Sequence, residues 1–137
     1  MDTQTNLGVD WMHLTGRLFL ACVFAASAYD KFLRAPGEVQ VVTSLHIPAP
    51  RTVLVLVGVF ETLGALALVI GIYARQASVL LALFMAVISL AVLRFWSPAG
   101  GPEARAQKWN GFVANVAIVG GLFYVIASGP GRFSWEP

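Results

Sequence analysis

The sequence predicts an all-α membrane protein, an antiparallel bundle of four transmembrane helices, and three observations support this fold class. Hydrophobic residues make up 58% of the 137 residues and charged residues only 12%. Four apolar runs are each close to the roughly 20 residues that a helix needs to cross a bilayer, and the charges gather between them. Open sheets leave unpaired edges in lipid, so helices are expected. One domain over residues 1–137 is predicted, with helices at about 14–33, 53–73, 77–96 and 112–128.

The first predicted helix covers residues 14–33. Residues 1–10 are polar and are expected to form a tail or an interfacial segment before it. Small residues along the helix would let a neighbouring helix approach closely. The run also resembles a signal peptide, because residues 26–28 fit a cleavage site, but Asp2 and Asp10 make the preceding segment unlike a basic n-region. A retained transmembrane helix is therefore the prediction.

The second predicted helix, over residues 53–73, carries Glu61 at its middle. An ionised side chain at this depth costs about 2.5–3.5 kcal/mol on insertion scales, so Glu61 is expected to point into the protein interior. Its role stays open between a ligand site and a structural polar contact in the bundle. The connection before this helix, over residues 35–51, has an apolar side and is expected to lie in the membrane interface as a short amphipathic segment.

The last two predicted helices follow from short and polar connections. Only a few residues separate 53–73 from 77–96, so these two helices should be antiparallel neighbours. Residues 97–109 are polar and predict a loop. The final helix, over 112–128, should end at Gly129, where glycine and proline follow in close succession.

Polar residues from all four predicted helices fall at a similar depth. At 1.5 Å per residue, Glu61 lies roughly 12 Å below the surface that carries the first and third connections, and Ser27, Ser89 and Asn115 lie at about 9–12 Å. Lys31 is shallower, but its long stem lets the charge turn inward, and the same holds for Arg94. The predicted ligand-binding cluster consists of Glu61, Lys31, Asn115, Arg94, Ser27 and Ser89. Its role stays open between a structural network, a proton-linked site and the polar end of a quinone pocket, which needs hydrogen-bond partners beside an apolar slot.

Several other chemistries lack the residues that they require. His13 and His46 both fall outside the predicted spans, so a haem held between helices is not expected. Cys22 is the only cysteine, and no motif for thiol redox chemistry, zinc or phosphate binding is present. No catalytic residue, metal ligand or intrinsic cofactor is predicted. The net charge of +2 is dispersed, so no nucleic-acid partner is expected.

The distribution of basic residues predicts an orientation. Six of them flank the first and third connections and three lie on the opposite side: Lys31, Arg34, Arg51, Arg94, Arg105 and Lys108 against Arg17, Arg75 and Arg132. The positive-inside rule then places those two connections in the cytoplasm and both termini in the periplasm.

Four stretches carry a resemblance to a known family. They are RLF from Arg17 with AYDKF ending at Phe32, IPAP at 47–50, GVFETLGALALVIGIYAR at 58–75, and NGFVANVAIVGGLFYVIASGPGRFS at 110–134. Over about residues 16–134 the sequence resembles the DoxX family of small four-helix bacterial membrane proteins. It departs from the family pattern at Ala28, where a glycine is usual, and at Arg94–Trp96, where a histidine is common.

The resemblance implies a bacterial cytoplasmic membrane protein with one of several functions. Some members of the family are the membrane subunit of a thiosulfate:quinone oxidoreductase, and others associate with thiol-handling proteins. The first expectation is a non-catalytic accessory or anchoring subunit of a membrane complex, with the bilayer and other subunits or a second copy as partners. The alternatives are a quinone-binding oxidoreductase subunit and a small proton-linked transporter, although no inverted repeat is visible.

Overall fold

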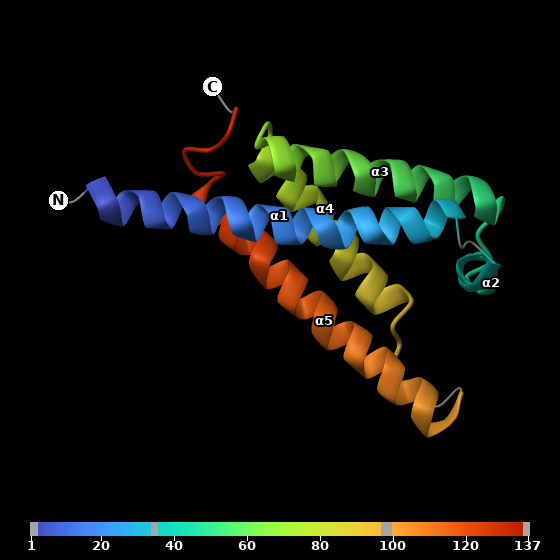
Figure 1. The fold of residues 1–137 in the computed structure, drawn as a ribbon. Helices are drawn as coiled ribbons and strands as arrows, with labels where there is room; N and C mark the ends of the chain where they lie inside the picture. The colour runs from blue at the N-terminus through green and yellow to red at the C-terminus, as the bar shows by residue number, and fades with distance from the viewer. Residues whose placement is uncertain (1–2, 34–35, 97–99, 136–137) are drawn as a thin grey trace.

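The computed structural model describes residues 3–33, 36–96 and 100–135, and within these ranges the chain forms five helices and no strand (Figure 1). They are α1 (Thr3–Leu33), α2 (Pro36–Ser44), α3 (Pro50–Ile70), α4 (Ala74–Ala91) and α5 (Gly101–Ser128). All except α2 are long and apolar enough to cross a membrane. The prediction of an all-α bundle with four membrane-spanning helices is therefore confirmed.

Two predicted helix starts are wrong. The first helix begins at Thr3 rather than at residue 14, and the last begins at Gly101 rather than at residue 112. Hydropathy marks only the apolar part of a helix, whereas backbone hydrogen bonds continue through polar turns. Pro102 in the first turn and Glu103 beside it also favour a helix start at this point. Most of the predicted loop over 97–109 is thus helical, and its residues 97–99 lie outside the described ranges.

The connection between α1 and α3 contains the short helix α2. After α2 the chain reverses through His46 and Ala49, both with left-handed backbone conformations at φ 59° and 51°. After this reversal the chain enters α3, which packs against α2. An ordered helix therefore occupies the segment for which a short amphipathic element was expected.

The helix α3 is central because it contacts α1, α2 and α4. Gly64 permits its close approach to α4, since a Cβ at this position would lie 2.8 Å from the Leu81 side chain. The turn into α4 is short and contains Gly71 at φ 82°. The two helices are antiparallel neighbours, as predicted. The buried core of the bundle includes Phe24, Leu68, Leu81 and Leu122.

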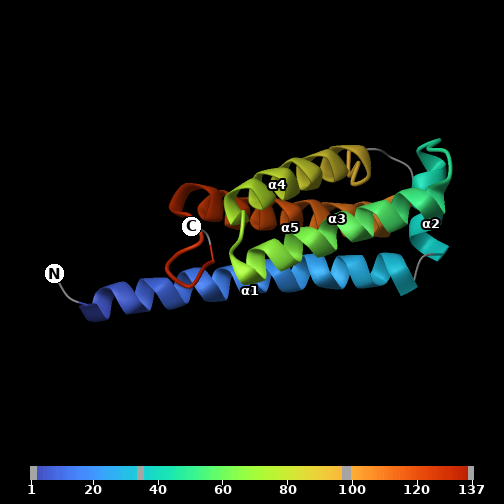
Figure 2. The ribbon, with the colours of Figure 1, turned by 90° about the horizontal axis from the view of Figure 1, so that it is seen from above.

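The bundle has two unlike ends. α1 and α3 run side by side, whereas α5 crosses α1 near Ser128 and diverges from it toward Gly101 (Figures 1 and 2). We call the end that carries α2 the α2 end. We call the other end, where residues 129–135 fold back onto the bundle, the C-terminal end.

Aromatic rings gather where α4 passes into α5 at the α2 end. Phe95 contacts Trp96, Trp109 and Phe112, with ring centroids 5.0–5.1 Å apart. Trp96 and Trp109 are about half exposed. We call these four residues the aromatic cluster.

Candidate functional site

A buried ion pair joins α1 to α3. Lys31 Nζ lies 3.1 Å from Glu61 Oε2 and donates a hydrogen bond to Glu61 Oε1 over 3.2 Å. Ser27, one helical turn before Lys31, donates to the same Oε1 over 3.1 Å and accepts a hydrogen bond from Lys31 over 2.7 Å. The Glu61 side chain is 2% exposed and that of Lys31 12%. The structure thus brings three of the predicted site residues into mutual contact.

The two oxygens of Glu61 differ in their surroundings. Oε1 accepts hydrogen bonds from both Ser27 and Lys31. Oε2 is buried and close to the Lys31 charge, yet it accepts no hydrogen bond from the part of the chain that the structure describes. The Lys31 charge at 3.1 Å compensates the burial of Oε2, and the oxygen keeps the capacity to accept a hydrogen bond from a bound hydroxyl group.

Glu38 on α2 adds a second carboxylate to the cluster. Its Oε2 lies 3.9 Å from Lys31 Nζ, and its side chain is 39% exposed. Exposure therefore increases from Glu61 through Lys31 to Glu38. The sequence analysis missed Glu38, because its proximity to Lys31 depends on how α2 folds back. Its place in the first turn of an amphipathic segment, where acidic residues are favoured, was the available signal.

Asn115 and Ser89 form a second polar pair between α5 and α4. The Asn115 amide Nδ2 donates to Ser89 Oγ over 2.9 Å, and Ser89 Oγ donates to the Met85 carbonyl over 2.7 Å. Because the single hydroxyl proton of Ser89 is used by Met85, Asn115 must be the donor in this pair. Asn115 then retains one N–H and its carbonyl oxygen for other partners.

The Glu61–Lys31 cluster and Asn115 line one cavity of about 400 Å³ at the α2 end. All five helices contribute to its wall. The polar lining residues are Ser27, Lys31, Glu38, Glu61 and Asn115. The remaining wall is apolar and includes Val41 and Leu45 of α2, Val57 of α3, and Phe84 and Ile88 of α4. We call this space the headgroup cavity.

Two predicted site residues lie outside the wall of the headgroup cavity. Ser89 is buried and acts through its hydrogen bond to Asn115. Arg94 is exposed and does not line the cavity. The reason is that α4 ends at Ala91, so Arg94 follows the helix and does not project from its inner face.

A buried arginine at the C-terminal end was missed. Arg17 on α1 is only 1% exposed, and its Nη2 donates to the Phe133 carbonyl. Phe133 also packs on Trp11, with ring centroids 4.9 Å apart. The backbone N–H of Trp135 donates to the Ile70 carbonyl over 3.3 Å, which ties the C-terminal segment to α3. Counting charges along the sequence assigned Arg17 to one side of the membrane and gave no sign that residues 129–135 would cover the side chain.

Comparison with known families identifies the family of this chain. A family model described as DoxX matches residues 12–94. The chain belongs to the DoxX family. The match to the DoxX model includes Ser27, Lys31 and Glu61, whereas Asn115 and the C-terminal segment lie beyond it. This DoxX-family protein is therefore a multi-pass integral membrane protein.

Two curated proteins are similar to this DoxX-family chain. An Escherichia coli (strain K12) protein described as inner membrane protein YphA is 26% identical over 123 residues, which cover 90% of this chain and 86% of that protein. A Schizosaccharomyces pombe protein described as a Surfeit locus protein 4 homolog is 32% identical over 81 residues, covering 58% of this chain and 26% of that protein. No solved structure gives a significant match.

Proposed function

We propose that this DoxX-family protein is a quinone-binding membrane subunit of an oxidoreductase and that the headgroup cavity holds the quinone ring. One observation carries the proposal: a buried Glu61–Lys31 ion pair opens onto a cavity whose wall is otherwise mostly apolar. Ionisable residues within membrane helices are costly, and each is by default a candidate for a ligand or ion site. A purely structural ion pair would not require a space beside it.

The size and the polar groups of the cavity suit a quinone. Small-molecule sites have volumes of about 300–1,000 Å³ and few polar groups in an apolar wall, and this cavity has about 400 Å³. Lys31 has three N–H donors, of which Ser27 and Glu61 require two. The remaining N–H of Asn115 is available for a ring carbonyl, and the third N–H of Lys31 would reach one by turning from Glu61 Oε2 at 3.1 Å and Glu38 Oε2 at 3.9 Å. Glu61 Oε2 is available for a ring hydroxyl in the reduced form.

A bound quinone supplies reversible uptake of two electrons and two protons. The chain's own contribution is to orient the ring and to exchange protons at its oxygens. Lys31 Nζ would donate to a carbonyl oxygen, and Glu61 Oε2 would accept from a hydroxyl. Glu38 lies 3.9 Å from Lys31 and is partly exposed, so it would connect this buried pair with water at the α2 end.

The proposal includes a partner and a location. Electrons would come from another subunit that docks at the α2 end. We place the protein in the bacterial cytoplasmic membrane with the α2 end in the cytoplasm, because most basic residues flank that end. The name of the E. coli relative, an inner membrane protein, supports the membrane assignment.

The test is quinone retention by purified protein in lipid nanodiscs. We expect the wild type to retain about one molecule of a tailed benzoquinone per protein, in addition to the amount that empty nanodiscs retain. Lys31→Met should reduce retention to the level of empty nanodiscs, because the ring carbonyl loses its charged donor. Quinone would be extracted after capture of the protein and quantified by chromatography.

Thr62→Val provides the matched control. Thr62 follows Glu61 on α3, but its hydroxyl donates to the Gly58 carbonyl over 2.7 Å and it lines a different hollow. This variant should retain quinone like the wild type. Equal retention by wild type, Lys31→Met and empty nanodiscs would refute quinone binding.

A non-catalytic anchoring subunit is the second candidate function. The exposure of α5 favours this function. Only 11% of the residues in the apolar stretch of α5 are buried in the bundle, compared with 33% for α3 and for α4. A helix this exposed offers a broad surface to another membrane subunit. Purification at near-native expression would test this function, and isolation of the protein without any partner would count against it.

A further inference from the structure

Asn115 separates the headgroup cavity from a second hollow on the outside of the bundle. This hollow is a groove of about 420 Å³ between α4 and α5, which we call the α4–α5 groove. Asn115 lines both the headgroup cavity and the groove. Ser89, its hydrogen-bond partner, lines the groove as well. The Asn115–Ser89 pair is thus a polar boundary between the two spaces.

We propose that the bound quinone is a long-tailed one and that its tail passes Asn115 and lies in the α4–α5 groove. This inference rests on the proposed function and names the class of quinone and its route. The headgroup cavity has about 400 Å³, a volume suited to a ring but not to an extended isoprenoid chain. A long tail therefore needs an exit into hydrocarbon, and Asn115 is where the cavity wall is shared with an apolar groove.

The direction of the α4–α5 groove fits a lipid tail. On α5 the groove continues from Asn115 to Phe123, which is about 12 Å along the helix. Because α5 begins at the α2 end and finishes at the C-terminal end, this path leads from the headgroup cavity toward the middle of the bundle. Apart from Ser89 and Asn115, the lining residues are apolar or glycine, and they include Val116, Val119 and Gly120.

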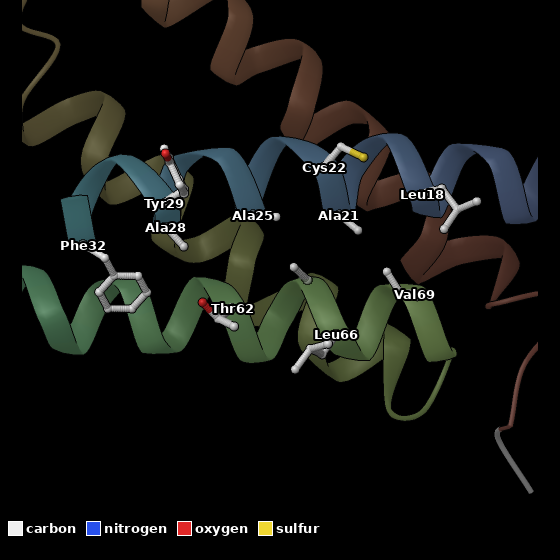
Figure 3. Close-up of a pocket in the computed structure, with 11 residues that line it drawn as sticks. Leu18, Ala21, Cys22, Ala25, Ala28, Tyr29, Phe32, Thr62, Leu66 and Val69 are labelled. Atoms are coloured by element: carbon white, nitrogen blue, oxygen red, sulfur yellow. The ribbon is translucent and has the colours of Figure 1, made fainter. Parts of the chain in front are cut away.

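A second apolar groove, between α1 and α3, serves as an internal comparison (Figure 3). It has a similar volume of about 400 Å³, and its lining residues include Ala25 of α1 and Leu66 of α3. None of the described residues that line this groove also lines the headgroup cavity. A tail attached to a ring in the cavity would therefore not enter the α1–α3 groove.

Gly120 and Ala25 allow each groove to be filled selectively. A Cβ at Gly120 would meet no heavy atom within 4 Å, and Ala25 is exposed. Phenylalanine at either position should therefore leave the helix packing intact. A quinone tail gains little hydrophobic energy on leaving lipid for a groove, so the expected effect of a filled groove is steric exclusion of the tail.

The experiment measures the affinity of two quinones for three proteins in nanodiscs. The probes are a tailless dimethoxy-methyl-benzoquinone and the same ring with a long isoprenoid tail, and the proteins are wild type, Gly120→Phe and Ala25→Phe. We expect Gly120→Phe to weaken binding of the long-tailed quinone about tenfold or more and to leave the affinity for the tailless quinone unchanged. Ala25→Phe should bind both quinones like the wild type.

Each contrary result has a distinct meaning. Undiminished binding of the long-tailed quinone by Gly120→Phe, or a loss with Ala25→Phe instead, would overturn the tail path while headgroup binding stands. Equal losses of both quinones with Gly120→Phe would also overturn it, since the effect would not depend on a tail. Failure of the wild type to bind either quinone would refute the proposed function itself. Thermal melting of all three proteins verifies that they remain folded.

Discussion

α1 carries a buried cation toward each end of the bundle, and the two cations have different surroundings. Lys31, at the α2 end, contacts a carboxylate and lines a cavity. Arg17, at the C-terminal end, donates to a backbone carbonyl beneath a folded-back segment. The two residues are separated by about 21 Å along the helix. Both are costly to bury, and Lys31 also lines a cavity that a ligand could fill.

The difference shows that burial of a charge does not by itself indicate a binding site. The guanidinium of Arg17 fastens the C-terminal segment to the bundle, which is a structural role. The ammonium of Lys31 contacts Ser27 and Glu61 and also faces the headgroup cavity. Substitutions at the C-terminal end should therefore change stability, and substitutions at the α2 end should change ligand affinity.

The largest effect is expected for Gly71→Ala at the C-terminal end. Gly71 has φ 82°, and an added Cβ would lie 2.6 Å from Ser134 Cβ and would also collide with the Arg17 guanidinium. The backbone strain costs about 1–3 kcal/mol and the overpacking about 1–3 kcal/mol more. Thermal melting in detergent should show a large decrease in stability. Gly120→Ala is the control, and equal melting temperatures for the two variants would contradict the close packing at Gly71.

Arg17→Met should have the next largest effect. The Phe133 carbonyl loses its buried donor, which costs about 2 kcal/mol, and residues 129–135 should detach more often. Trypsin should then cleave faster after Arg132, whose side chain is 74% exposed, while quinone affinity stays constant. Arg51→Met, an exposed cation at the α2 end, is the control for general destabilisation. A loss of quinone binding in Arg17→Met would contradict the assignment of a structural role to the C-terminal end and ligand binding to the α2 end.

Glu61→Gln should reduce quinone affinity about tenfold, equivalent to about 1.4 kcal/mol, and should preserve the fold. Glutamine has nearly the same volume, but the side chain loses its charge and the orientation that it gives to Lys31. Lys31 can still bond to Ser27 and approach Glu38, so the cation is not left isolated. Binding in nanodiscs and thermal melting measure the two quantities separately. A variant that fails to fold would instead assign Glu61 a structural role.

Glu38→Gln should have the smallest effect. Its carboxylate is 39% exposed and 3.9 Å from Lys31 Nζ, and an ion pair with this exposure contributes about 0–1 kcal/mol. We expect Glu38→Gln to bind quinone slightly more weakly than the wild type at low salt. At high salt the two proteins should have equal affinity, because exposed charges are screened. A decrease as large as that of Glu61→Gln would show that α2 contributes directly to the headgroup site.

Hydropathy and depth along the helices predicted the fold and part of the cluster. The apolar runs identify the spanning helices, since lipid imposes their length. Ser27 and Lys31 are one turn apart, so they share one face of α1, and their similar depth to Glu61 made a common cluster predictable. Asn115 and Ser89 fall at a similar depth by the rise of 1.5 Å per residue along their two helices.

The remaining features depend on tertiary structure that local patterns do not specify. Arg94 was misplaced because α4 ends earlier than the apolar run, and each residue of error rotates a side chain by about 100°. Glu38 and Arg17 were missed because each contact depends on a segment that folds back: α2 brings Glu38 to Lys31, and residues 129–135 bring the Phe133 carbonyl to Arg17. The divergence of α5 from α1, seen in Figure 1, also has no signature in hydropathy.

The aromatic cluster at the start of α5 has a consequence for how the protein responds to its membrane. Tryptophan rings favour the boundary between lipid headgroups and hydrocarbon, so Trp96 and Trp109 fix the vertical position of this end of the bundle. Asn115 lies about 9 Å further along α5 than Trp109. The depth of Asn115 below one leaflet's surface is therefore set by these rings, and Trp11 and Trp135, 57% and 80% exposed, anchor the opposite end in the same way.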